Sequence, residues 1–173
     1  IYAKLFAYIE FLFFSKEFNI TPEITLVNFD IPFTRIPTLA TEVNRFATAQ
    51  ADRALRLNLG PSSDQRLEGD TSDIAEHVFA KTEDGKVKVW SDQFGIPEST
   101  PQTYFLPGKI IVQGGEGDDI IDLSGITDAS IEYEIDGGGG NDIIRLGAGR
   151  GVVRGGEGDD TIWGLGGADD IDG

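Results

Sequence analysis

Several residue types that carry common chemistry are absent or rare in this chain of 173 residues. There is no cysteine, which excludes disulfide bonds and thiolate catalysis, and the one histidine, His77, cannot form an H-E-x-x-H zinc site. No G-x-S-x-G nucleophile motif occurs, and no glycine-rich stretch ends in the Gly-Lys-Ser/Thr of a phosphate-binding loop. Glu76 precedes His77, but neighbouring positions do not supply the convergent geometry that acid–base catalysis requires. We therefore expect that this chain is not an enzyme.

Basic residues are also scarce, with 14 lysines and arginines against 30 aspartates and glutamates, a net charge of −16. Nucleic acids and anionic membrane surfaces would repel such a chain, so we expect cations as its partners, and neither nucleic acid nor membrane. The imbalance is concentrated in residues 110–173, which hold 15 acidic residues, three basic residues and 18 of the 23 glycines. Two regions of different chemistry therefore share the chain.

Long uninterrupted hydrophobic runs are missing too. Residues 1–14 are strongly apolar, but Lys4 and Glu10 interrupt them, and the segment is shorter than the roughly 20 residues that a membrane helix needs. We interpret it as a core helix or a pair of strands, and a membrane-inserting segment of a toxin is the alternative. Methionine is absent and the last repeat runs to Gly173, so we expect a larger parent protein whose repeats continue beyond residue 173.

The composition of residues 1–92 predicts an α+β region of unknown role. Residues 18–36 place apolar and β-branched residues between prolines, which favours short extended pieces. Over residues 38–57 apolar residues recur near helical spacing, Thr38 can cap the start and a Gly-Pro pair follows the end. We therefore predict a helix there.

A β-hairpin is predicted over residues 75–90. The pair Asp84-Gly85 is a turn signal, and the residues that follow it alternate between polar and apolar side chains. Three prolines then indicate a linker over residues 93–109. We place the domain boundary in this linker.

A nine-residue repeat begins at Gly114. Its copies share glycine at the first and fourth positions, aspartate at the sixth and isoleucine at the eighth, except that the last copy has glycine at the third position in place of the second. The copies span residues 114–122, 137–145, 155–163 and 164–172. Residues 146–154 keep the period but have glycine at the sixth position.

The composition of the repeat predicts its conformation. Six glycine-rich residues can adopt left-handed backbone angles and form a tight turn with inward carbonyl groups. The next three residues form a short strand whose middle residue points inward, and turns must stack because one turn cannot bury that side chain alone. The inward residues would be Ile121, Ile144, Ile162 and Ile171.

The aspartate at the sixth position would lie beside the turn carbonyls. Carboxylate and carbonyl oxygens without histidine or thiolate favour a hard cation, and six or more such oxygens suit calcium. Without the ion the carboxylates repel one another and the ordering entropy of glycine is unopposed. We therefore expect this segment to be disordered without calcium, so that the binding energy of the metal becomes folding energy.

The repeats match the pattern G-G-x-G-x-D-x-U-x, in which U is a large aliphatic residue. This pattern resembles the repeats-in-toxin (RTX) family of secreted bacterial proteins, and the resemblance covers about residues 110–173. It implies an all-β parallel β-roll of the right-handed β-helix type. It also implies export in an unfolded state through a type I pathway, followed by folding outside the cell, where calcium is abundant.

The phase of the repeats predicts which turns share an edge of the roll. In a two-sided roll successive turns alternate between edges, so stacked turns begin two repeat periods apart, as those at Gly137 and Gly155 do. Gly114 precedes Gly137 by more than two periods, and we interpret the excess as an insertion of five in the turn at the far edge. Turns 114–119, 137–142 and 155–160 then share one edge, and residues 123–130, 146–151 and 164–169 share the other.

The resemblance also implies the ligands of each ion, which lies between two stacked turns. The earlier turn gives the carbonyls of its second and fourth positions and its aspartate, and the later turn gives those of its first and third positions and its aspartate. About two calcium ions on one edge follow, with Asp142 shared between them. The first set is Gly115, Gly117, Asp119, Gly137, Gly139 and Asp142, and the second is Gly138, Gly140, Asp142, Gly155, Glu157 and Asp160.

The expected function is that of a calcium-binding, calcium-folded module in a larger secreted protein, with an extracellular or cell-surface location. An adhesin or a surface-layer component is the expected type of parent, against whose other parts the module would pack. Two alternatives remain open: a fragment of a pore-forming RTX cytolysin, and the C-terminal part of a secreted lipase or protease.

Overall fold

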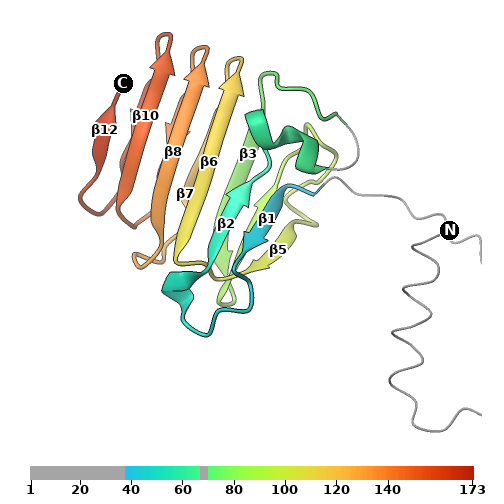
Figure 1. The fold of residues 1–173 in the computed structure, drawn as a ribbon, viewed down its shortest axis with the longest axis vertical. Coiled ribbons are helices and arrows are strands. Elements are labelled where there is room, and N and C mark those ends of the chain that lie inside the picture. The colour runs from blue at the N-terminus through green and yellow to red at the C-terminus, as the bar shows by residue number, and fades with distance from the viewer. Residues whose placement is uncertain (1–37, 67–69) are drawn as a thin grey trace, which may run out of the picture. The chain divides into compact units, whose positions relative to one another are not determined.

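Two six-stranded sheets form the fold of the residues that the computed structural model describes, which are 38–66 and 70–173 (Figure 1). In spatial order the first sheet contains β1 (Ala40–Val43), β2 (Ala54–Leu57), β6 (Lys109–Glu116), β8 (Glu132–Gly139), β10 (Gly151–Glu157) and β12 (Asp170–Asp172). The second contains β11 (Thr161–Trp163), β9 (Ile143–Arg145), β7 (Ile120–Gly125), β3 (His77–Glu83), β4 (Lys86–Trp90) and β5 (Gln102–Phe105). The mostly-β structure expected for the repeats is confirmed.

From β6 onward the chain alternates between the two sheets. β6, β8, β10 and β12 are parallel neighbours in the first sheet, and β7, β9 and β11 are parallel neighbours in the second. Gly115 is paired with Gly138, and Gly138 with Gly156, so equivalent positions of the three turns lie one above another. The prediction that turns 114–119, 137–142 and 155–160 share an edge is confirmed.

The core lies between the sheets, because each strand turns alternate side chains inward. Ile121 and Ile144 are fully buried, and Ile162 is partly buried against the same core. Ile171 was also predicted to point inward, but its exposed fraction is 43%. It lies on β12, the outermost strand of the first sheet, which has a neighbour on one side only in the described residues.

The residues before the repeats continue the same arrangement, with one strand in each sheet. We call these two strands and the turn between them the first coil. β2 is parallel to β6, and β3 is parallel to β7. β1 then pairs with β2 in antiparallel fashion, and β4 and β5 extend the second sheet as an antiparallel meander. The repeats are therefore built directly onto the strands that precede them.

The helix predicted over residues 38–57 is wrong. Those residues form β1, a 3-10 helix η1 (Gln50–Asp52) and β2, with Asn44 at a φ of 54° after β1. Leu55 and Leu57 are buried while Arg56 between them is exposed, which is strand periodicity, and pairing with β6 stabilises it. A second 3-10 helix, η2 (Gly60–Arg66), follows. The described part of the predicted α+β region thus contains strands and short 3-10 helices rather than an α-helix.

The structure also differs from the predicted linker at residues 93–109. This segment contains β5, which pairs with β4, and the start of β6. All described residues belong to one compact unit. Prolines here lie in turns and beside an edge strand, where a missing N–H group costs no ladder hydrogen bond.

The predicted hairpin is confirmed: β3 and β4 are antiparallel, with positive φ at both Asp84 and Gly85. The interpretations of residues 1–14 and 18–36 concern segments outside the described residues. None of the helices in the described ranges is long and apolar enough to cross a bilayer.

Ile121→Ala tests the packing of the core in the second sheet. Ile121 is fully buried and lies between its strand neighbours Val78 and Ile144, so the variant leaves a cavity. We expect the free energy of unfolding, measured by urea titration in calcium, to fall by about 2–5 kcal/mol. The exposed Val152 supplies the control, since Val152→Ala should change it by less than about 0.5 kcal/mol.

Candidate metal site

Three glycine-rich turns stand in a row at one edge of the sheets. They are residues 114–119, 137–142 and 155–160, which lead from β6, β8 and β10 into β7, β9 and β11 and lie at the top of Figure 1. In each turn the glycines at the second and fourth positions have a positive φ, between 95° and 127°. A side chain there would be strained, so this turn geometry requires glycine.

Carbonyl oxygens from both sides enter the gap between neighbouring turns. A Cβ added at Gly138 would collide with the carbonyl oxygen of Gly115, and one at Gly140 with that of Gly117. In the opposite direction, a Cβ added at Gly114 would collide with the carbonyl oxygen of Gly137. The carbonyls of the second and fourth positions of an earlier turn therefore approach the later turn. The carbonyl of the first position of the later turn approaches the earlier turn.

The carbonyl of the third position also faces the preceding turn. Gly139 accepts a hydrogen bond of 2.7 Å from the N–H of Gly117, and Glu157 accepts one of 2.8 Å from the N–H of Gly140. A carbonyl oxygen has two lone pairs, so each retains capacity for a second partner.

The sixth-position aspartates form a ladder along the same edge. The N–H of Asp119 donates to Oδ1 of Asp142 at 2.9 Å, and the N–H of Asp142 donates to Oδ1 of Asp160 at 2.9 Å. Oδ1 of Asp119 accepts the N–H of Glu76 at 2.7 Å. In all three aspartates Oδ2 is buried and has no hydrogen-bond partner among the described residues.

Burial makes these carboxylates costly without a counter-charge. Asp119 and Asp142 are each only 1% exposed. Burial, and next the negative charges of Asp142, Glu76 and Asp73, raise the pKa of Asp119 to about 7. The pKa of Asp142 is also raised, by burial first and then by the charge of Asp160. A cation in the gaps would compensate these charges and give the free oxygens a partner.

The donors fit calcium better than any softer metal. They are carboxylate and main-chain carbonyl oxygens only, and hard cations prefer such ligands. Within the described residues no three His, Cys, Asp or Glu side chains gather around one point, so carbonyl groups would have to supply most of the ligands. The structure places all eleven residues predicted from the resemblance in these three stacked turns.

Two acidic residues at this edge were not identified from the sequence. Glu76 takes the aspartate position in the coil before the repeats, and Oδ1 of Asp73 accepts the N–H of Glu116 at 2.8 Å. Neither belongs to a repeat, and only the pairing of β3 with β7 brings them to the turns. No local signal marks them.

The opposite edge has different chemistry. Asp169 in the last turn accepts the N–H of Gly151 at 2.8 Å, but the turn beneath has glycine at the corresponding position. The buried hydroxyl of Tyr133 lies beside Gly147 in that lower turn. The stacked aspartates of the first edge are therefore not repeated on this side.

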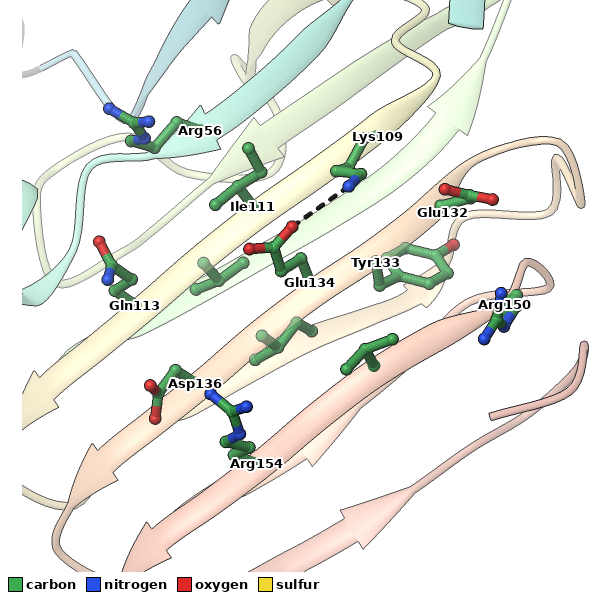
Figure 2. Close-up of a pocket in the computed structure, with 13 residues that line it drawn as sticks. Arg56, Lys109, Ile111, Gln113, Glu132, Tyr133, Glu134, Asp136, Arg150 and Arg154 are labelled. Carbon is green, nitrogen blue, oxygen red and sulfur yellow. Dashed lines mark hydrogen bonds and ion pairs between the residues drawn. The ribbon is translucent and has the colours of Figure 1, made fainter. Parts of the chain in front are cut away.

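A hollow of about 460 Å³ lies elsewhere, over the outer face of the first sheet (Figure 2). Charge alternates across its strands: Glu134 of β8 forms an ion pair of 3.2 Å with Lys109 of β6, and Asp136 is in register with Arg154 of β10. Opposite charges on neighbouring strands favour this register. This face has mixed charge and lacks the converging carbonyls of the turns.

The RTX calcium-binding nonapeptide repeat (4 copies) family matches residues 111–125, 134–153 and 147–173. These segments contain all three stacked turns and extend through the last repeat. No curated protein and no solved structure matches the chain.

Acidification should stabilise the calcium-free fold. The pKa of Asp119 is about 7 in the folded state against an ordinary 3.8, so the folded state holds a proton that the unfolded state has released. The contribution of this proton to the stability of the folded state is fully present below about pH 4 and is lost as the pH rises through about 7. Far-UV circular dichroism of the calcium-stripped chain should therefore show a β signal that is weak at about pH 8 and increases toward about pH 5, values that lie on either side of the folded-state pKa.

Asp119→Asn provides the control, because its amide cannot titrate. We expect the variant to be more stable than the parent chain at about pH 8 without calcium, and to depend less on pH. A parent chain that loses stability on acidification over this range would contradict the prediction.

Proposed function

Because residues 111–173 carry RTX calcium-binding nonapeptide repeats, we propose that they form a parallel β-roll that binds about two calcium ions along one edge and folds around them. One ion would lie between turns 114–119 and 137–142, and the other between turns 137–142 and 155–160. The proposal rests on one observation above all: the buried Oδ2 atoms of three stacked aspartates lack a partner where carbonyl oxygens converge.

The proposed ligands are those of the two sets given by the resemblance. In the first gap these are the carbonyls of Gly115, Gly117, Gly137 and Gly139 with the carboxylates of Asp119 and Asp142. In the second they are the carbonyls of Gly138, Gly140, Gly155 and Glu157 with the carboxylates of Asp142 and Asp160. Asp142 would use Oδ1 toward one gap and Oδ2 toward the other, since Oδ1 faces the N–H of Asp119 and Oδ2 lies on the side of Gly137 that the carbonyl of Gly155 approaches.

Calcium would act as the counter-charge that makes this edge foldable. The 15 acidic residues after residue 109 oppose compaction, and only three basic residues offset them. Binding requires both turns of a gap to be in place, so the energy of binding would stabilise the stacked arrangement directly. Where calcium is scarce the repeats would remain unfolded.

A repeat region that folds only at high calcium suits a protein that crosses the cell envelope unfolded and acts outside. We propose that this is a secreted module, exported through a type I pathway, which stabilises a larger extracellular protein such as an adhesin or surface-layer component. We also propose a binding role without catalysis. Two observations support these proposals: the carboxylate and carbonyl oxygens that gather at the edge of the sheets, and the match of the repeats to the RTX family.

Calcium removal tests the proposal on the whole chain. We expect far-UV circular dichroism to show a marked loss of β signal when calcium is chelated and its return when calcium is restored. Calorimetric titration of the calcium-free chain should give about two ions per chain. An unchanged spectrum together with no heat of binding would reject the proposed function.

Asp142→Asn tests the shared ligand. Because Asp142 would serve both gaps, the variant should weaken calcium binding by about tenfold or more, and by more than Asp119→Asn or Asp160→Asn does. Asp159→Asn removes the same charge from an exposed neighbouring position and should leave the affinity almost unchanged. Equal effects of Asp142→Asn and Asp159→Asn would mean that net charge, rather than ligation, sets the affinity.

A further inference from the structure

The coil that precedes the repeats reproduces the hydrogen bonds of the calcium-binding turns. Glu76 donates its N–H to Oδ1 of Asp119 and accepts the N–H of Ile120 at 2.8 Å. In the same way Asp119 donates to Oδ1 of Asp142 and accepts the N–H of Ile143 at 2.8 Å. Glu76 is therefore the structural equivalent of the sixth-position aspartate, although it lies outside any repeat.

Gly60 is likewise the equivalent of the first glycine of a turn. A Cβ added at Gly60 would collide with the carbonyl oxygen of Gly114, just as one at Gly114 would collide with that of Gly137. Oε2 of Glu76 accepts the N–H of Gly60 at 2.7 Å. The segment from Gly60 to Glu76 is much longer than a repeat turn, and it includes η2, which lies beside the row of turns in Figure 1.

The end of η2 brings a cation into this longer turn. Arg66 is fully buried, and its guanidinium forms an ion pair with Oε1 of Glu76. It donates Nη1 to the carbonyl of Asn58 at 2.8 Å, Nε to that of Asp70 at 2.7 Å and Nη2 to that of Ser72 at 2.9 Å. One face also lies over the ring of Phe94, 4.4 Å from its centroid.

We propose that the Arg66 guanidinium takes the place of a calcium ion in this first coil. It collects three main-chain carbonyl oxygens and a carboxylate, which is the kind of donor set that the repeat turns offer a metal. The idea rests on the proposed function, since the comparison is with calcium in those turns. Unlike calcium, the guanidinium is covalently attached to the chain, so its charge is present whether or not calcium is available.

The consequence is a segment that folds without calcium. Eleven of the 22 buried apolar residues lie between Leu39 and Ile96, so this part supplies half of the buried apolar side chains of the core. Its buried charge, Glu76, is paired internally, whereas Asp119 and Asp142 depend on an external cation.

The calcium-independent coil would then serve as the template for the first repeat. It already presents three hydrogen-bonding groups to the first repeat. The N–H of Glu76 bonds to Asp119, the carbonyl of Glu76 to Ile120 and the carboxylate of Asp73 to Glu116. Adding a repeat to a preformed edge avoids the cost of nucleating a stack from a disordered chain.

Hydrogen exchange of the whole chain, followed by mass spectrometry with and without calcium, tests the inference. Without calcium, peptides from β2, β3 and β4 should remain protected while peptides from residues 114–173 exchange freely. In Arg66→Met, which keeps an apolar stem but lacks the charge, protection of β2, β3 and β4 without calcium should fall by about a hundredfold or more, because Glu76 is left buried and unpaired. Arg56→Met, at an exposed position of β2, is the matched control and should retain protection.

Two results would overturn the inference. One is a parent chain in which β2, β3 and β4 exchange freely without calcium, which needs no variant and so does not depend on whether Arg66→Met folds. The other is an Arg66→Met chain as protected as the parent in the absence of calcium. Failure of the proposed function looks different: calcium would then bring no protection to residues 114–173, while β2, β3 and β4 stayed protected throughout.

Discussion

The placement of carboxylates among carbonyl oxygens in stacked turns is the constraint on which the rest of this structure depends. Asp119 and Asp142 are buried, each with one oxygen hydrogen-bonded to a neighbouring turn and the other without a protein partner among the described residues. Burial of the charged carboxylates and the repulsion between them both destabilise this arrangement. The apolar ladder behind the turns is narrow, since each short strand contributes only one isoleucine to it. A cation between the turns resolves this conflict with a single interaction, because it draws both neighbouring turns toward the same point.

The first coil faces the same electrostatic problem and meets it with its own side chains. Glu76 occupies the aspartate position, but Arg66 provides the positive charge and three carbonyls complete its hydrogen bonds. The segment from Gly60 to Glu76 has more residues than a six-residue turn and includes η2, whose last residue is Arg66. In the proposed scheme turn length and the source of positive charge are linked: the short turns would depend on an external ion, and the long turn has Arg66.

Much of the repeat region could be predicted from the sequence because its signals are local and repeated. The nine-residue period located the turns. Because stacked turns begin two periods apart, the sequence also placed three turns on one edge, despite the insertion that follows the first of these turns. The hairpin was equally readable from Asp84-Gly85. The helix predicted over residues 38–57 failed for the opposite reason, since β2 is a strand by virtue of pairing with β6, which comes much later in the chain. Glu76 and Arg66 could not be found either, because their roles arise only when β3 lies beside β7.

The two edges of the fold differ in the residues that form their turns, and this difference is the reason for proposing cation binding at only one of them. On the first edge every turn from 114 onward has an aspartate at the sixth position, and Glu76 continues the series. On the other edge Gly151 breaks the series, and the hydroxyl of Tyr133 lies beside Gly147 in the interior of that turn. A neutral side chain there leaves no buried charge to compensate, so that edge can close by packing and hydrogen bonds alone. Because each coil runs through both edges, a cation bound at the first edge would also restrain the turns of the other edge.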